Sequence, residues 1–219
     1  MSFSNRVDAG RKLARQLGSY ADRDDVIVLG IPRGGIRVAF EVAEGLNAPL
    51  DVILSCKLGV PGHEELPFGA VASGGVRVLD QRVVSGVGIS HAEIELISAQ
   101  VRRELELRER VYRGRLAPLD VRELTVVLVD DGIATGSSMR AAIDALRRLR
   151  PAKIVAAIPV APASTCGRLK EEVDELVCLE VREEFFAIGQ FYEDFSQVTD
   201  YEVSELLCRA RRSDIRKAA

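Results

Sequence analysis

Short runs of apolar, often β-branched residues alternate along the chain with segments in which apolar residues recur at helical spacing. The runs predict strands at residues 26–29, 50–56, 125–129, 154–160 and 176–179. The segments 36–46 and 139–149 lie between them and are predicted as helices. Strands that alternate with helices typically form a parallel sheet joined by crossover helices. We therefore predict an α/β fold with a doubly wound, mainly parallel five-stranded sheet.

The second and third predicted strands are separated by an excursion of about 65 residues, which is too long for an ordinary loop. Its first part, residues 57–75, is rich in Gly and Pro and predicts either a flexible lid or a static hairpin loop. A long helix follows, because Ser90 and Glu93 form the pattern of a capping box. We assign 57–116 to this loop and long-helix excursion from a core at about 20–182, all within one domain, 1–219.

The C-terminal part, about 183–210, contains a cluster of aromatic residues and is predicted to form a small hood. Five of the chain's aromatic residues fall there: Phe185, Phe186, Phe191, Tyr192 and Phe195. These rings either stack on a planar ligand or form a core where the tail docks, and the sequence leaves both open. The tail after them is basic, and we interpret it as a solvated terminus in preference to an RNA-binding arm.

Composition excludes several classes of protein. The chain has 219 residues, of which 47% are hydrophobic, so a disordered or fibrous protein is excluded. Its net charge of -3 provides no basic field for nucleic acid or anionic lipid. No apolar run approaches the roughly 18 residues of a membrane span. The four cysteines form no CxxC pair, and we predict reduced, buried thiols in a cytoplasmic protein.

The chemistry is concentrated directly after the third predicted strand. Asp130 and Asp131 end that strand, and a turn with two glycines then opens a helix that begins with hydroxyl residues. Free N–H groups and the dipole at a helix start form an anion site, which a phosphate fits. The two carboxylates would repel a phosphate but accept hydrogen bonds from a sugar diol. The run therefore predicts a site for a ribose 5-phosphate. The alternative is a plain strand-to-helix turn capped by Asp.

This run resembles the phosphoribosyl-diphosphate (PRPP) binding motif of type I phosphoribosyltransferases. The resemblance implies that Asp130 and Asp131 hold the ribose hydroxyls and that the loop after them grips the 5-phosphate. The residues of this loop are Gly132, Ile133, Ala134, Thr135, Gly136, Ser137 and Ser138. It is not a P-loop, because Ser137, and not Lys, follows the second glycine.

Two further segments agree with this resemblance. The first strand is followed by Arg33, Gly34 and Gly35, which stand where the family has its pyrophosphate loop. The second strand ends in Lys57, again at a carboxyl end, where open α/β sheets bind ligands. The resemblance implies that Arg33 and Lys57 bind the leaving pyrophosphate and act in catalysis together with Asp130 and Asp131. Taken singly, each cation is more typical of an exposed surface, but two cations at strand ends that converge on one crevice favour the binding role.

The whole pattern is similar to that of stand-alone bacterial phosphoribosyltransferase-domain proteins of unassigned substrate. It implies Mg2+-dependent transfer of the 5-phosphoribosyl group from PRPP to a nitrogenous base, with Mg2+ carried by PRPP and no metal held by the protein. We expect Phe186 and Tyr192 to stack on the base, and a homodimer without membrane or nucleic-acid partners. Enzymes for 6-oxopurines commonly carry Asp at the position of Ala134, so we expect another acceptor. The alternative is a regulator that binds PRPP or a nucleotide without turnover.

Overall fold

The computed structural model describes residues 2–114 and 119–217, with side chains up to residue 212. Five parallel strands form the main sheet in the order β2-β1-β6-β7-β8. Their bounds are Val26–Gly30 for β1, Leu50–Val52 for β2, Thr125–Val129 for β6, Lys153–Pro162 for β7 and Glu175–Arg182 for β8. The predicted α/β fold with a parallel five-stranded sheet is confirmed.

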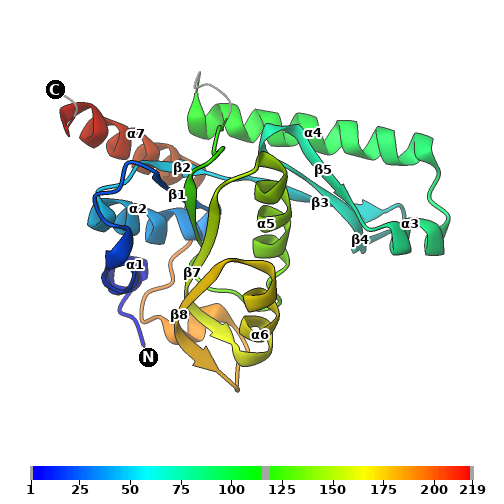
Figure 1. Cartoon of the computed structure of the whole chain (residues 1–219). Coiled ribbons are helices and arrows are strands. Elements are labelled where there is room, and N and C mark those ends of the chain that lie inside the picture. Colours follow the sequence, from blue (N-terminus) through cyan, green and yellow to red (C-terminus); the bar gives the residue numbers. More distant parts are fainter. Residues whose placement is uncertain (1, 115–118, 218–219) are drawn as a thin grey trace.

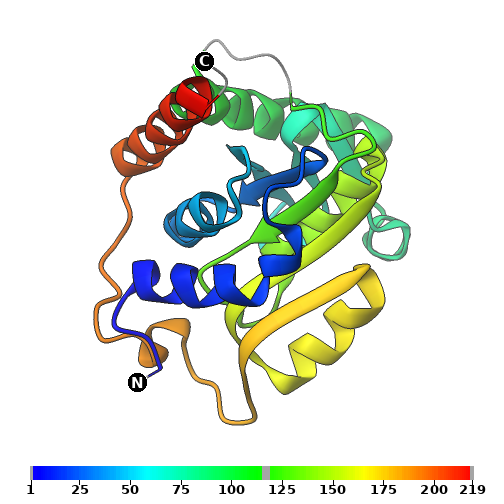
Figure 2. The same ribbon diagram turned by 60° about the vertical axis from the view of Figure 1, so that its left-hand side comes forward.

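Helices cover both faces of this sheet (Figures 1 and 2). On one face lie α1 (Arg6–Gln16) and α2 (Gly34–Leu46), with a short turn of 3-10 helix, Gly18–Tyr20, after α1. On the other face lie α5 (Ser137–Leu149) and α6 (Ala163–Glu172). Alternate residues of β6 enter the two cores, because successive side chains of a strand point to opposite faces.

The predicted strand 50–56 is wrong in one respect, because it divides between two sheets. After β2 the chain leaves the main sheet, and β3 (Ser55–Val60), β4 (His63–Ala72) and β5 (Val76–Leu79) form a second, antiparallel sheet. The division occurs at Leu54, whose N–H donates to Ser73 Oγ and whose carbonyl accepts from the Ser73 N–H. A continuous apolar run does not reveal which strands it will pair with, so periodicity alone missed the break.

Residues 57–75 belong to the second sheet. They form the β3–β4 hairpin and a turn of 3-10 helix, Ser73–Gly75. Two helices complete the excursion, α3 (Gln81–Val87) and α4 (His91–Arg113), and α4 extends along the second sheet in Figure 1. The capping box of Ser90 and Glu93 is present at its start. The predicted end of the excursion, at 115–116, lies outside the described residues.

The C-terminal segment returns to the N-terminus. After β8 come a 3-10 helix, Ile188–Phe191, and α7 (Asp200–Lys217), joined by an extended segment that runs beside the first residues of the chain (Figure 2). Phe191 and Tyr192 pack with Phe3 in a small cluster of buried side chains. For these two residues the core role, left open by the sequence, is the one that the structure shows.

The prediction of four buried thiols needs correction. Only Cys166 is buried, Cys56 and Cys178 are half-buried, and Cys208 is exposed on α7. All four are free of disulfides. Among the described residues, no helix combines the length and the apolar character that a transmembrane span requires.

Candidate active site

Two turns lie side by side at the carboxyl edge of the main sheet, because β1 and β6 are neighbours and Gly30 is in register with Val129. A methyl group at Gly34 would lie 1.9 Å from Asp131 Oδ2, and one at Gly35 would lie 2.8 Å from Asp130 Cα. Neither position accepts a side chain, since contacts this short are repulsive. The structure thus brings the predicted pyrophosphate loop directly against both predicted ribose carboxylates. The peptide bond between Pro32 and Arg33 is cis.

The two carboxylates have different surroundings. Asp130 is half-buried, and its Oδ1 accepts a hydrogen bond from the Asp131 N–H at 2.9 Å. Loss of hydration, together with the negative charge of Asp131, raises the pKa of Asp130 well above its ordinary value. Asp131 is buried, and its Oδ2 accepts a hydrogen bond from Arg6 Nε at 2.7 Å. The pair therefore holds one carboxylate that is ion-paired to Arg6 and one whose ionisation is disfavoured.

Arg6 is a residue that the sequence analysis missed. It is the first residue of α1, and its side chain is 9% exposed in the ion pair with Asp131. A signal was present, because Arg6 precedes the buried residues Ala9, Gly10 and Leu13 by three, four and seven positions. These spacings place an arginine on the apolar face of an amphipathic helix, where a charge requires a partner.

The turn after Asp131 is held from both sides. The Ile133 N–H donates to the Val160 carbonyl at 3.0 Å, and Thr165 Oγ1 donates to the Ala134 carbonyl at 2.7 Å. Gly136 has a φ of +76°, a left-handed conformation that favours glycine. The prediction for Ile133 is thereby corrected. Its side chain is buried and its N–H is already bonded within the protein, so it shapes the turn and does not offer a donor to a phosphate.

The start of α5 offers free donors. Thr135 Oγ1 and Ser137 Oγ lie 2.6 Å apart, and Thr135 and Ser138 are exposed. Within residues 2–114 and 119–217, no protein acceptor is bonded to the N–H of Thr135 or Gly136. Unpaired N–H groups and hydroxyls at the start of a helix suit a phosphate. This geometry supports the predicted 5-phosphate site.

Arg33 lines a cavity of about 440 Å³ next to these turns. Other residues that line it are Ser55, Arg108, Tyr112, Ser138 and Asp200. Tyr112 donates a hydrogen bond to Asp200 Oδ1 at 2.5 Å, and burial together with this carboxylate raises the pKa of Tyr112 to about 12. Arg108, on α4, was not singled out from the sequence. Two guanidinium groups and two serine hydroxyls make this cavity suitable for a polyanion.

Lys57 does not join Arg33 in that cavity. It lies within β3 opposite Ala70, and not at the end of a main-sheet strand as the sequence analysis assumed. It lines a separate cavity of about 720 Å³ together with Ser137, Arg140 and Glu172. The two cavities border the same helix start, since Ser137 lines one and Ser138 lines the other.

The two residues predicted to stack on the base differ in their exposure to solvent. Tyr192 is 3% exposed, with its ring 5.3 Å from Phe3 and 5.0 Å from Phe195 between centroids. Such burial leaves no ring face for a base, so the stacking role predicted for Tyr192 is wrong. Phe186 is 89% exposed. Ile188, two residues further on, packs on the turn after Asp131, where a methyl group at Gly132 would lie 2.5 Å from Ile188 Cγ2.

The described residues contain no group of three or more His, Cys, Asp or Glu side chains that could hold a metal ion. The nearest acidic pair, Asp130 and Asp131, is engaged by the Asp131 N–H and by Arg6. One oxygen of each carboxylate, Asp130 Oδ1 and Asp131 Oδ2, is thus occupied within the protein.

Residues 3–196 match the family described as "Phosphoribosyl transferase domain", and the chain belongs to this family. The predicted family membership is confirmed.

Known relatives agree with this assignment. A Mycobacterium tuberculosis protein named "Putative phosphoribosyl transferase" is 46% identical over 212 residues, or 96% of this chain and 47% of that protein. The chain thus spans about half the length of the curated relatives it matches. The crystal structure of TT1426 from Thermus thermophilus is 39% identical and has a TM-score of 0.85, covering 95% of this chain and 99% of that one. The "Bifunctional protein PyrR" of Chloroflexus aurantiacus is 34% identical over 133 residues, 58% of this chain and 66% of that protein.

Proposed function

We propose that this protein transfers the 5-phosphoribosyl group of PRPP to a nitrogenous base and releases pyrophosphate. The observation that carries the proposal is the contact between two turns at the carboxyl edge. Gly34 and Gly35 lie against Asp131 and Asp130, and the same carboxylates lead into the free donors at the start of α5. One edge of the sheet therefore offers acceptors for a sugar diol and donors for phosphates, and PRPP contains both of these groups.

In this proposal each turn binds one part of PRPP. Asp130 and Asp131 accept hydrogen bonds from the ribose hydroxyls, and the N–H groups and hydroxyls of 135–138 hold the 5-phosphate. Arg33 holds the pyrophosphate, and we add Arg108, which lines the same cavity. Lys57 must reach the leaving group from β3 across the start of α5, because it lines the neighbouring cavity.

The reaction needs no nucleophile from the protein. A nitrogen of the base forms a bond to C1 of the ribose while the bond from C1 to pyrophosphate breaks, with inversion at C1. The electron pair of the broken bond leaves with pyrophosphate, and the proton of the attacking nitrogen is released to water. Negative charge grows on the leaving group, where the guanidinium of Arg33 is placed to stabilise it. Mg2+ carried by PRPP would add positive charge at the leaving group, next to Arg33.

The acceptor is the least constrained part of the proposal. Phe186 is exposed, and Ile188, two residues further on, packs on the phosphate turn, which supports stacking of Phe186 on the base. Ala134 is exposed and offers no side chain that could act as a base toward a purine. We therefore propose an acceptor other than hypoxanthine or guanine. On the family resemblance we also propose a cytoplasmic homodimer in nucleotide metabolism.

Two measurements test this function. PRPP with Mg2+ should raise the melting temperature of the wild type, because a ligand that binds only the folded state adds stability. Thr135→Ala should reduce this shift, and combining it with Asp131→Asn should abolish it. Ser19→Ala, which removes an exposed hydroxyl at the opposite edge of the sheet, should keep the shift. A wild type that gains no stability from PRPP would contradict the proposed site.

The second measurement separates an enzyme from a binding protein. Purified protein is supplied with Mg2+, PRPP and a panel of nitrogenous bases, and released pyrophosphate is measured. Release that depends on one base supports the transferase. A thermal shift with PRPP but no release with any base would instead support the regulator that the sequence left as the alternative.

A further inference from the structure

Two adjacent carboxylates are an unfavourable place for a substrate that carries several negative charges. The structure removes one of these charges within the protein. Arg6 Nε donates to Asp131 Oδ2 at 2.7 Å, and the two side chains are 9% and 11% exposed. Because this pair is nearly shielded from water, the guanidinium compensates the carboxylate strongly. Asp130, the second carboxylate, resists ionisation beside it.

Arg6 is itself fixed by the segment before α7. Its Nη1 donates to the Ser196 carbonyl at 2.7 Å, and its guanidinium carbon lies 3.8 Å from the centroid of the Phe195 ring. The planar guanidinium thus stacks on one residue of the segment and donates to the next. A lysine would keep the charge at this position but lose both the fork of donors and the stacking.

The backbone of Asp131 is held by the same segment. Tyr192 donates a hydrogen bond from its hydroxyl to the Asp131 carbonyl at 2.6 Å, in a buried contact. The segment is tied to the N-terminus, since the N–H groups of Glu193 and Asp194 donate to the carbonyls of Phe3 and Ser4. Two regions from opposite ends of the chain, α1 and residues 192–196, therefore fix one residue of the site.

We propose that Arg6 and Tyr192 are positioning residues for PRPP binding: Arg6 neutralises and orients the Asp131 carboxylate, and Tyr192 fixes the backbone that carries it. The inference rests on the proposed function, because Asp131 is the ribose ligand there. Neither residue touches substrate. Arg6 lets two carboxylates face a ribose while phosphates bind on either side, and Tyr192 maintains the distance between Asp131 and the turn that follows it.

The experiment measures the dissociation constant of PRPP with Mg2+ by titration calorimetry. Tyr192→Phe removes one hydroxyl and should weaken PRPP binding about three- to tenfold, as expected for one hydrogen bond that orders the site. Arg6→Lys should weaken it about tenfold or more, because two hydrogen bonds and the stacking change together. Tyr20→Phe and Arg23→Lys are matched controls. They remove similar contacts at the opposite edge of the sheet and should leave the constant within about twofold.

A comparison of two ligands that differ in charge separates neutralisation of Asp131 by Arg6 from a simple loss of structure. Arg6→Gln leaves the charge of Asp131 uncompensated, so it should weaken PRPP more than a nucleoside 5-monophosphate, which carries less negative charge. Tyr192→Phe changes no charge and should weaken both ligands by the same factor. A variant that merely unfolds would lose both ligands in proportion to its folded fraction, which circular dichroism measures independently.

The possible failures are distinguishable. A wild type that does not bind PRPP contradicts the proposed function. A wild type that binds PRPP, together with folded Arg6→Lys and Tyr192→Phe variants that bind it equally well, contradicts the positioning roles alone. Equal losses for PRPP and monophosphate in Arg6→Gln contradict the role of Arg6 in neutralising charge.

Discussion

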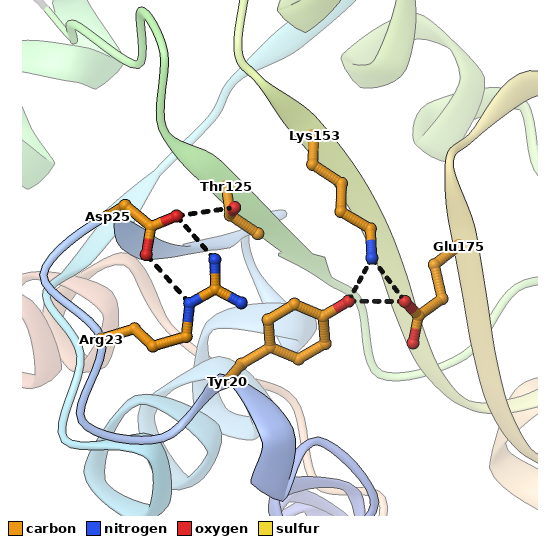
Figure 3. Close-up of polar contacts among 6 residues, drawn as sticks. All are labelled: Tyr20, Arg23, Asp25, Thr125, Lys153 and Glu175. Carbon is orange, nitrogen blue, oxygen red and sulfur yellow. Dashed lines mark hydrogen bonds and ion pairs between the residues drawn. The ribbon is translucent and has the colours of Figure 1, made fainter.

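The two edges of the main sheet differ in whether their charged side chains have partners within the protein. At the amino edge, Lys153 Nζ lies 2.6 Å from Tyr20 Oη and 2.7 Å from Glu175 Oε2, and Tyr20 donates to the same carboxylate (Figure 3). Beside this triad Arg23 pairs with Asp25 at 2.6 Å. Each charged group drawn there is satisfied by another side chain. The charges drawn in Figure 3 are therefore compensated within the protein.

At the carboxyl edge the charges are only partly satisfied. Asp131 has Arg6, but among the described residues Arg33 has no ion-pair partner and the backbone N–H groups of Thr135 and Gly136 have no protein acceptor. At the amino edge the charged groups have partners within the protein. At the carboxyl edge some cations and hydrogen-bond donors have none, and we expect a ligand to bind these groups. The comparison predicts that changes at the carboxyl edge alter function and that changes at the amino edge alter stability.

The largest effect is expected at Arg33. Arg33→Ala should slow turnover by about a hundredfold, as when one preorganised contact to a developing charge is lost. Lys57→Ala should do the same if Lys57 reaches the leaving group. Binding of a monophosphate product should change little, and Arg23→Ala at the amino edge should leave turnover intact. Equal loss of product affinity and turnover would exclude a specific leaving-group role, and steady-state kinetics with product titrations measure both.

The next effect concerns the acceptor. Phe186→Ala should raise the KM of the base by about five- to a hundredfold, which corresponds to roughly 1–3 kcal/mol of stacking. Phe185→Ala is the matched control, because this neighbour packs against Phe191 with ring centroids 5.2 Å apart. It should lower the melting temperature and leave the KM of the base unchanged. If both variants behave alike, Phe186 does not contact the base.

Arg108 tests how far the leaving-group cavity extends. Arg108→Ala should raise the KM of PRPP about tenfold, since one charged hydrogen bond contributes about 1.4 kcal/mol or more. Arg103→Ala, an exposed arginine on the same helix, should have no effect. A KM of PRPP that does not change in Arg108→Ala would restrict the cavity's function to its Arg33 side.

The smallest effect belongs to the amino edge and is a change in stability. Hydrogen bonds from Lys153 and Tyr20 hold the pKa of Glu175 below its ordinary value of 4.5. A group with a lowered folded pKa contributes stability above its unfolded pKa and loses it as the pH falls through the folded pKa. Glu175→Gln should therefore cost up to about 1 kcal/mol near neutral pH, because the pair is partly exposed.

The pH dependence provides the check on this last prediction. The difference in unfolding free energy between wild type and Glu175→Gln should shrink as the pH falls below 4.5. Denaturant unfolding across this range measures it. PRPP affinity should not change at neutral pH, and a loss of affinity there would break the distinction between the two edges.

The sequence by itself located β1, β6, β7 and β8 of the main sheet and the two carboxylates that follow β6. Residues 125–129 form β6 with the predicted bounds, and Asp130 and Asp131 follow it as expected. Such features are local, since apolar periodicity and turn chemistry act over a few residues. The sequence also placed the glycine-containing turn after β1 at the carboxyl end of a strand, where parallel sheets bind ligands.

Only the tertiary structure decided how that edge is completed. Arg6 and Asp131 are separated by 125 residues, and Tyr192 and Asp131 by 61, so no local pattern links them. For the same reason Tyr192 was assigned to a base when it holds the backbone of the site. Lys57 was placed at a strand end, although the chain changes sheets before reaching it. Long-range pairing depends on which surfaces pack together, a property of the whole fold that the spacing of residues along the chain does not encode.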